Sequence, residues 1–105
     1  MVHHPHTIEE YNKLKNESAG KLVIVDFSAS WCGPCKLIAP TYEEFSKTYG
    51  DCVFIHVDVD ELEDLPDNQD VRGVPTFKYF KNGNLLCQFS GANKSKLEEL
   101  IKKHK

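Results

Sequence analysis

Two cysteines three positions apart, Cys32 and Cys35, are the residues of this sequence whose types and spacing best suit chemistry. At the start of a helix, two thiols with this spacing lie within one turn of each other and can close a small disulfide ring. The unpaired N–H groups and the partial positive charge of a helix N-terminus favour a thiolate over a thiol. Cys32, at the very start, is therefore predicted to remain at the surface as the nucleophile, and Cys35 to resolve the mixed disulfide that follows.

The residues around this pair distinguish redox chemistry from its main alternative, half of a metal site. Pro34 suits the first turn of a helix, where its missing N–H costs nothing. A zinc ribbon needs a second close pair of cysteines, whereas Cys52 and Cys87 stand alone. The pair also follows an apolar, strand-like run, a context typical of redox cysteines. Cys52 and Cys87 are interpreted as small packing residues rather than regulatory thiols, and Cys87, on an expected edge strand, is the more reactive of the two.

Two titratable residues, Asp26 and His56, stand inside apolar runs that predict strands. Burying a charged carboxylate is costly, so Asp26 is expected to hold its proton within the run 22–27; the alternative is a strand-end cap that reaches solvent. His56 lies in the run 53–57, which should form a neighbouring strand. If the two side chains face each other, they can share a proton and titrate as a unit. Otherwise His56 points to solvent and has no role.

The elements that must position these residues follow from hydrophobic periodicity and turn signals. They alternate in the order βαβαβαββα, which implies an α/β fold: a central mixed sheet of about five strands, flanked by about four helices on both faces, with an antiparallel hairpin at one edge. The hairpin turn is Asn82-Gly83, because both turn residues must tolerate positive φ. The first half of the chain is expected to form a short N-terminal strand, a helix over 7–18 with a Thr7–Glu10 capping box, a strand over 22–27, and a helix from the cysteine pair to Tyr49 with Pro40 inside it. The second half is expected to form a strand over 52–57, a short helix within 58–70, strands over 76–80 and 85–89, and a last helix capped by Asn93.

Length and composition narrow the classes of protein to consider. The chain has 105 residues, enough for one domain over 1–105, and 40% of them are hydrophobic, enough for one core. A net charge of -3 provides no field for a phosphate backbone, which argues against nucleic acid as a partner. No apolar run approaches the length of a membrane span, and residues 1–6 lack the pattern of a secretory signal. His3, His4 and His6 are interpreted as a polar terminal strand rather than a metal site, because nothing nearby completes a coordination set.

Three stretches of the sequence resemble a known family. The run Val25–Lys36, VDFSASWCGPCK, is similar to the active-site signature of the thioredoxin family, and the run 73–76, GVPT, is similar to its second signature. Phe89–Lys94 resembles eukaryotic cytosolic members, and the similarity extends in register from Val2 to the C-terminus. The Gly-Pro between the thiols resembles the reducing branch of the family, since the oxidising disulfide isomerases usually have Gly-His there.

The resemblance implies roles for several further positions. Asp26 matches the family's buried aspartate, which lies beneath the thiols and accepts a proton from Cys35. Pro75 matches a cis-proline that faces the thiol pair and leaves the Val74 backbone free to pair with an extended substrate. Trp31 matches the contact surface, and core packing of its indole is the alternative. The residues that match the substrate groove are Trp31, Gly33, Pro34, Gly73, Val74, Pro75, Gly91 and Ala92.

The resemblance also implies a dithiol–disulfide oxidoreductase with no bound cofactor and no metal. Its electrons would come from NADPH through a flavin-containing thioredoxin reductase, and its recipients would include peroxiredoxin and ribonucleotide reductase. The protein is expected to be a monomer in the cytoplasm that can also enter the nucleus. One alternative is a binding module that uses the groove to hold partners, against which the intact pair with Asp26 and Pro75 argues. Another is a zinc or iron–sulfur carrier that uses the pair across a dimer. Gly73 departs from the many animal members that have a cysteine at that position.

Overall fold

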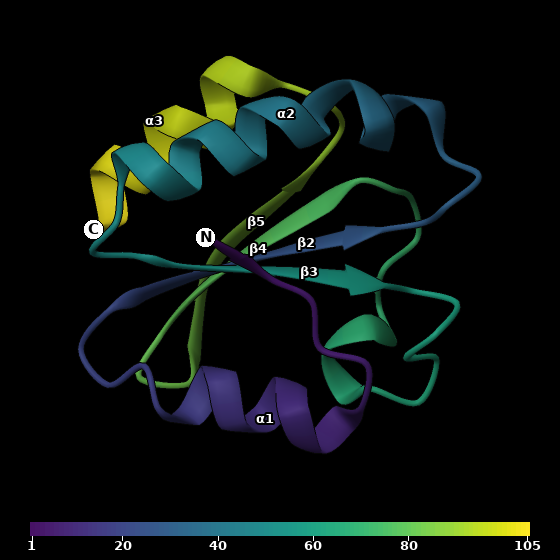
Figure 1. Ribbon diagram of the computed structural model, residues 1–105, viewed down its shortest axis with the longest axis horizontal. Helices are drawn as coiled ribbons and strands as arrows, with labels where there is room; N and C mark the ends of the chain where they lie inside the picture. The colour runs from purple at the N-terminus through teal and green to yellow at the C-terminus, as the bar shows by residue number, and fades with distance from the viewer.

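A five-stranded mixed sheet forms the centre of the computed structural model, which describes residues 1–105, and helices cover both faces of the sheet (Figure 1). The strand order across the sheet is β1-β3-β2-β4-β5. The elements are β1 (Val2–His3), α1 (Ile8–Asn16), β2 (Leu22–Ser28), α2 (Gly33–Thr48), β3 (Val53–Asp58), the 3-10 turn η1 (Pro66–Asn68), β4 (Thr76–Lys81), β5 (Asn84–Ser90) and α3 (Lys94–His104). This order confirms the alternation that the sequence predicts, apart from one helix.

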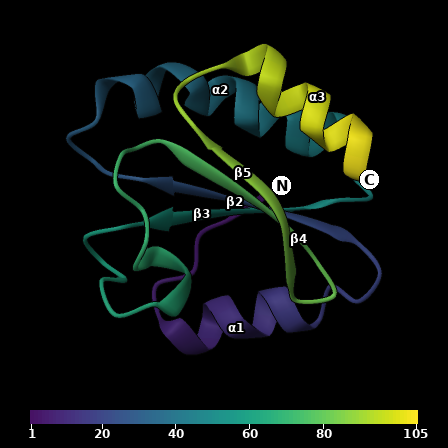
Figure 2. The same ribbon diagram turned by 180° about the vertical axis from the view of Figure 1, so that it is seen from behind.

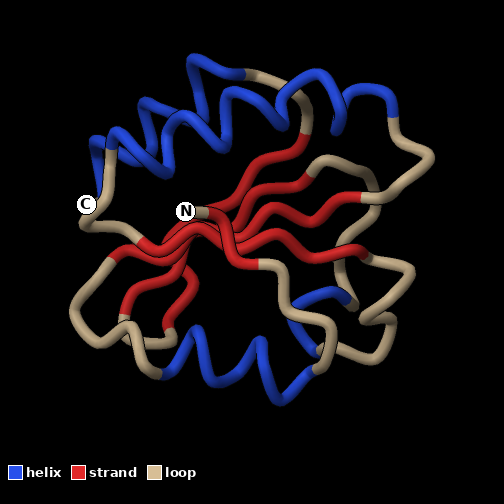
Figure 3. The backbone as a smooth tube through the Cα atoms, in the orientation of Figure 1, coloured by secondary structure: helices blue, strands red, loops and turns tan.

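The strand pairing brings the loops that follow β2 and β3 to the same end of the sheet. Strands β1, β3 and β2 run parallel, β4 runs antiparallel to β2, and β5 runs antiparallel to β4. Strand β2 is buried along its whole length, as expected for a central strand covered on both faces. Because β2 and β3 are parallel, the loops that follow them leave the sheet on the same side (Figure 3). Helix α2 begins at this side, directly after the loop that follows β2.

Helices α2 and α3 cover one face of the sheet and α1 covers the other (Figure 2). One apolar layer lies beneath α2 and α3, and a second lies beneath α1. Side chains of β2 alternate between the layers: Ile24 packs in the layer of α2 and α3, and Val25 packs in the layer of α1. Since successive side chains of a strand point to opposite faces, Asp26 faces α2. Strand β2 therefore places the Asp26 carboxyl in the apolar layer beneath α2, the helix that begins at the cysteine pair.

Three local signals of the sequence are confirmed. The Thr7 hydroxyl accepts a hydrogen bond of 3.1 Å from the backbone N–H of Glu10 at the start of α1. Asn82 and Gly83 form the turn between β4 and β5 with φ of 52° and 81°. The side chain of Asn93 caps α3. Each signal depends on neighbouring residues only, which is why the sequence suffices to predict it.

The prediction of a short helix within 58–70 is wrong. This stretch forms turns and the single 3-10 turn η1, so the protein has three α-helices rather than about four. The Asp58 carboxylate accepts the backbone N–H groups of Asp60 and Glu61 at 2.9 and 3.3 Å, which satisfies these donors in a turn. Pro66 then keeps the residue before it out of the helical region. None of the three helices combines the length and apolar character that crossing a membrane requires.

Candidate active site

The two cysteines of the pair are joined by a disulfide bond at the N-terminus of α2. Cys32 is the N-cap residue, and its sulfur accepts a hydrogen bond of 3.1 Å from the backbone N–H of Cys35. The two Cα atoms are 5.3 Å apart. Pro34 lies in the first turn of the helix, where its missing N–H removes no hydrogen bond. The spacing and the helix start thus bring the two sulfurs into bonding contact, as the sequence predicts.

The prediction that Cys32 remains at the surface is wrong for the disulfide form. Only 3% of Cys32 and 4% of Cys35 are exposed. The two residues pack with Ala29, and Val59 and Val74 lie against the same cluster. The carbonyl oxygen of Val74 lies 3.6 Å from the Cys32 sulfur. Cys32 is buried because the loop before β4 lies over it, so the sulfur is bordered by the backbone of that loop.

This covering segment, residues 71–75, is here named the cis-proline loop. Its peptide bond between Val74 and Pro75 is cis, as the family resemblance implies. The Gly91 N–H donates a hydrogen bond of 2.9 Å to the Pro75 carbonyl, and Gly91 adopts a φ of 107°, which favours glycine. Val74 takes part in none of the backbone–backbone hydrogen bonds of the chain. Its N–H and C=O are therefore available to an extended polypeptide.

Trp31 immediately precedes Cys32 in the chain and lies at the surface. It is 70% exposed, so the alternative that it packs in the core is wrong, and its indole N–H donates to the Asp60 carboxylate at 3.0 Å. A hollow of about 200 Å³ separates the indole from the cis-proline loop; its lining is Trp31, Val59, Val71, Arg72, Gly73 and Val74. The sequence reasoning missed Val59 and Asp60, because only the folded chain brings them to Trp31. The other groove candidates lie at the surface: Gly33, Pro34 and Ala92 are exposed, and Gly91 is half-buried.

Asp26 lies within β2 and is only 2% exposed, so the alternative of a cap that reaches solvent is wrong. Burial raises the pKa of Asp26 from 3.8 to about 7, because a charged carboxylate loses its water there. One of its oxygens, Oδ1, is buried without a hydrogen-bond partner. An unpartnered buried oxygen favours the neutral carboxyl. Asp26 can therefore hold a proton near neutral pH and exchange it with a neighbouring group.

His56 is the partner of Asp26 in the parallel register of β2 and β3. Register partners point to the same face, so both side chains lie on the α2 side of the sheet. No hydrogen bond joins them; the half-buried ring of His56 packs against the ring of His4, with 4.9 Å between centroids. Burial and then the nearby His4 lower the pKa of His56. His56 also lines a hollow of about 220 Å³ together with Cys35, which places it beside the thiol pair.

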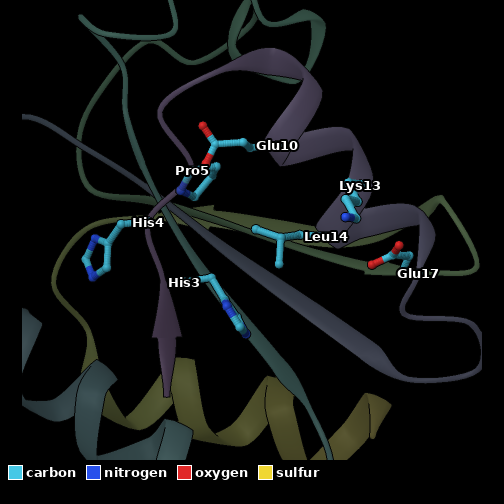
Figure 4. A pocket seen from close by; sticks show the side chains of 7 residues that line it. All are labelled: His3, His4, Pro5, Glu10, Lys13, Leu14 and Glu17. Atoms are coloured by element: carbon cyan, nitrogen blue, oxygen red, sulfur yellow. The ribbon is translucent and has the colours of Figure 1, made fainter.

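The largest hollow of the surface lies elsewhere, between the N-terminal segment and α1 (Figure 4). It measures about 460 Å³ and is lined by His3, His4, Pro5, Glu10, Lys13, Leu14 and Glu17. Figure 4 shows the rings of His3 and His4 pointing away from each other and from Glu10. No three His, Cys, Asp or Glu side chains in the chain are grouped so that they could hold a metal ion. This hollow shares no residue with the disulfide site.

The two remaining cysteines are free thiols. Cys52 is buried and Cys87 is half-buried, and both contact the core beneath α2 and α3. Burial raises the pKa of Cys52 to about 11 and also raises that of Cys87. A raised pKa leaves little reactive thiolate at neutral pH. These surroundings favour packing over regulation as the role of both residues.

Comparison with known proteins agrees with the geometry of the site. The family model described as Thioredoxin matches residues 2–103. A thioredoxin of Gallus gallus is 55% identical over 82 residues, 78% of each chain. Thioredoxin 1 of Plasmodium falciparum is 54% identical over 87 residues, 83% of this chain and 84% of that one. The solved structure of a Fasciola hepatica thioredoxin matches with a TM-score of 0.93 at 43% identity, over 98% of this chain and 99% of that one.

Proposed function

The chain belongs to the thioredoxin family and is a dithiol–disulfide oxidoreductase, and on that basis we propose how its residues divide the reaction. The Cys32 thiolate attacks one sulfur of a substrate disulfide and expels the other as a thiolate. The Cys35 thiol then gives up its proton and attacks the Cys32 sulfur of the mixed disulfide, which releases the second substrate sulfur. The Cys32–Cys35 disulfide forms, and two electrons pass to the substrate.

The position of Cys32 at the N-cap of α2 is the observation that carries this assignment. Its sulfur accepts the N–H of Cys35, and the same donor would stabilise a thiolate together with the helix dipole. The sulfur also lies beside the Val74 carbonyl, where an extended substrate can pair. Cys35 lies within the first turn of the helix, where the Cys32 sulfur is its bonding partner.

We assign Asp26 as the base that takes the proton of Cys35. With a pKa of about 7, its carboxyl can both accept and release a proton near neutral pH. His56 is proposed as its proton-sharing partner, because the two are register partners on one face of the sheet. His56 and Cys35 line a common hollow of about 220 Å³, which has room for water between these two residues.

Substrate recognition in this proposal rests on the main chain of Val74 and the surface around it. An extended substrate segment pairs with the Val74 N–H and C=O, while its side chains lie against Trp31 and the Gly91-Ala92 turn. The rest of the groove consists of Gly33, Pro34, Gly73 and Pro75. Because main-chain pairing accepts many sequences, such a groove suits several disulfide-containing recipients, such as peroxiredoxin and ribonucleotide reductase.

The proposal also covers the source of electrons, the oligomeric state and the location of the protein in the cell. Electrons come from NADPH through thioredoxin reductase, and the protein itself works without a bound cofactor. Residues 1–105 act as a single domain and as a monomer. The protein works in the cytoplasm and can enter the nucleus.

Insulin reduction with NADPH and thioredoxin reductase tests the proposal. The wild type should turn over, whereas Cys32→Ser should lose all turnover and keep its fold, because the attacking sulfur is gone. Cys35→Ser should still attack but not resolve, and should accumulate mixed disulfides that a reductant releases. Substantial turnover by Cys32→Ser would refute its role as nucleophile, and trapping by Cys32→Ser would reverse the two roles. A protein that only binds partners would consume no NADPH.

A further inference from the structure

A lysine is buried on the face of the sheet that α1 covers. Lys78 lies in β4 and is only 3% exposed. Its ammonium donates to the backbone carbonyl of Asp67 at 2.8 Å and to the carboxylate of Asp70 at 2.5 Å, and it lies 5.4 Å from the centroid of the Phe27 ring. A buried ammonium is costly unless partners of this kind satisfy it. The contacts therefore tie the segment 67–70 to the sheet.

The same segment is held from α1. The Asp67 carboxylate accepts a hydrogen bond of 2.6 Å from the Tyr11 hydroxyl and one of 2.8 Å from the Lys15 ammonium. That ammonium also lies 3.9 Å from the centroid of the Phe80 ring, on the strand that carries Lys78. Asp67 is thus fixed by its backbone to β4 and by its side chain to α1.

The segment anchored in this way leads directly into the cis-proline loop. Asp70 immediately precedes Val71, which packs against the core beneath α1. At the other end of the loop, the Thr76 hydroxyl donates to the Gly73 carbonyl at 2.5 Å. Thr76 and Lys78 are alternate residues of β4, so their side chains lie on the same face of the strand. One strand therefore supplies an anchor for each end of the loop.

We propose that Lys78 is a positioning residue for protein substrates. Its contacts with Asp67 and Asp70 fix the N-terminal end of the cis-proline loop, and thereby the Val74 backbone on which a substrate strand pairs. This inference rests on the proposed function, because it assumes that pairing. Lys78 should therefore matter for a polypeptide disulfide and matter little for a small disulfide, which reaches the Cys32 sulfur without pairing with the loop.

The test uses Lys78→Met, which keeps the length of the side chain and removes the charge and both hydrogen bonds. Insulin reduction is measured in turnover with NADPH and an excess of thioredoxin reductase. Reduction of the small aromatic disulfide DTNB is measured in a single turnover with the pre-reduced protein, in the absence of any other thiol. The KM for insulin should rise about fivefold or more while kcat changes less than about twofold. The reason is that the variant binds the polypeptide substrate less well, while the thiol groups that carry out the reaction are unchanged. The second-order rate constant for DTNB should stay within about twofold of the wild-type value.

Lys81→Met is the matched control. Lys81 lies on the same strand, and its ammonium donates to the His104 carbonyl at 3.2 Å, at the end of β4 away from the loop. This variant should leave the kinetics of both substrates unchanged. Asp70→Ala removes one hydrogen-bond partner of Lys78 at an exposed position, and this variant tests the inference if Lys78→Met does not fold. Its KM for insulin should rise while its DTNB rate stays the same.

Two results would overturn the inference. Equal slowing of both substrates would show a general loss of structure, and an unchanged KM for insulin in the folded variants would show that Lys78 does not position the loop. Failure of the proposed function has a different signature, because the wild-type protein would then reduce neither disulfide.

Discussion

Replacing Asp26 by asparagine should stabilise the disulfide form of the protein above neutral pH. The wild-type carboxyl is 2% exposed, and burial raises its pKa from 3.8 to about 7. Since one pKa unit corresponds to about 1.4 kcal/mol, ionising this carboxyl in the folded state costs roughly 4 kcal/mol of folding free energy. Asparagine has a similar shape and does not ionise, so the Asp26→Asn variant avoids this cost.

The stabilisation has a defined pH window. Below pH 3.8 the carboxyl is protonated in the folded and the unfolded chain, so its ionisation does not affect stability. Between pH 3.8 and about 7 the unfolded chain ionises while the folded protein does not, so the free energy of unfolding of the wild type falls as the pH rises. Above this window both states are ionised and the loss is complete. The difference between Asp26→Asn and the wild type should therefore grow across the window and then level off.

Urea unfolding of the oxidised protein at about pH 4 to about pH 9, followed by far-UV circular dichroism, measures this difference. Trp31 is 70% exposed in the folded state, so its fluorescence is a weaker reporter. The buried asparagine amide adds a cost that does not depend on pH, so the slope with pH is the test and the offset is not. Asp64→Asn, at an exposed position, is the control and should show no such slope. A difference that stays flat over the whole range would refute the reasoning.

Two further substitutions test the roles assigned to the other thiols and to His56. The double variant Cys52→Ser, Cys87→Ser should keep at least about half of the wild-type turnover with insulin, because both thiols contact the core beneath α2 and α3 rather than the disulfide cluster. A loss of about tenfold or more would identify a working thiol. His56→Gln should move the acid limb of the pH–rate profile for resolution by Cys35 to higher pH. Because burial and His4 lower the pKa of His56, the ring is protonated only at a pH below the ordinary histidine value of 6.5; there the positive ring favours the ionised form of Asp26, and glutamine does not. Superimposable profiles would show that the two residues do not act together.

The disulfide site could be predicted from the sequence because most of its parts are local. The spacing of Cys32 and Cys35, the apolar strand before them and the proline between them lie within one short run. Asp26 belongs to the same run, whose apolar residues on both faces favour a central strand and hence a buried carboxyl over a cap that reaches solvent. The cis bond before Pro75 is different, because most X-Pro bonds are trans and only the family resemblance indicates it.

The burial of Cys32 could not be predicted in the same way. Its cover is the Val74 backbone, 42 residues further along the chain, and no local pattern connects the two. The prediction of a helix within 58–70 is wrong for a related reason. Leu62 and Leu65 are indeed buried, but they reach the core from turns whose backbone donors bond to the Asp58 carboxylate. Apolar spacing indicates which side chains are buried, and it does not fix the backbone that carries them.

Asp26 and Lys78 are the two buried residues with an acidic or basic side chain, and their surroundings differ. They lie on neighbouring strands and face opposite layers, Asp26 toward α2 and Lys78 toward α1. An oxygen of Asp26 has no partner, so the proton is its means of neutralisation and moves at a pH near neutral. The ammonium of Lys78 has a carbonyl and a carboxylate as hydrogen-bond partners, and these contacts satisfy its charge. The alternation of side chains along β4 predicts which face of the sheet Lys78 lies on, but it does not predict its partners. Asp67 and Asp70 belong to an acidic stretch of the sequence, and such a stretch by itself indicates an exposed surface.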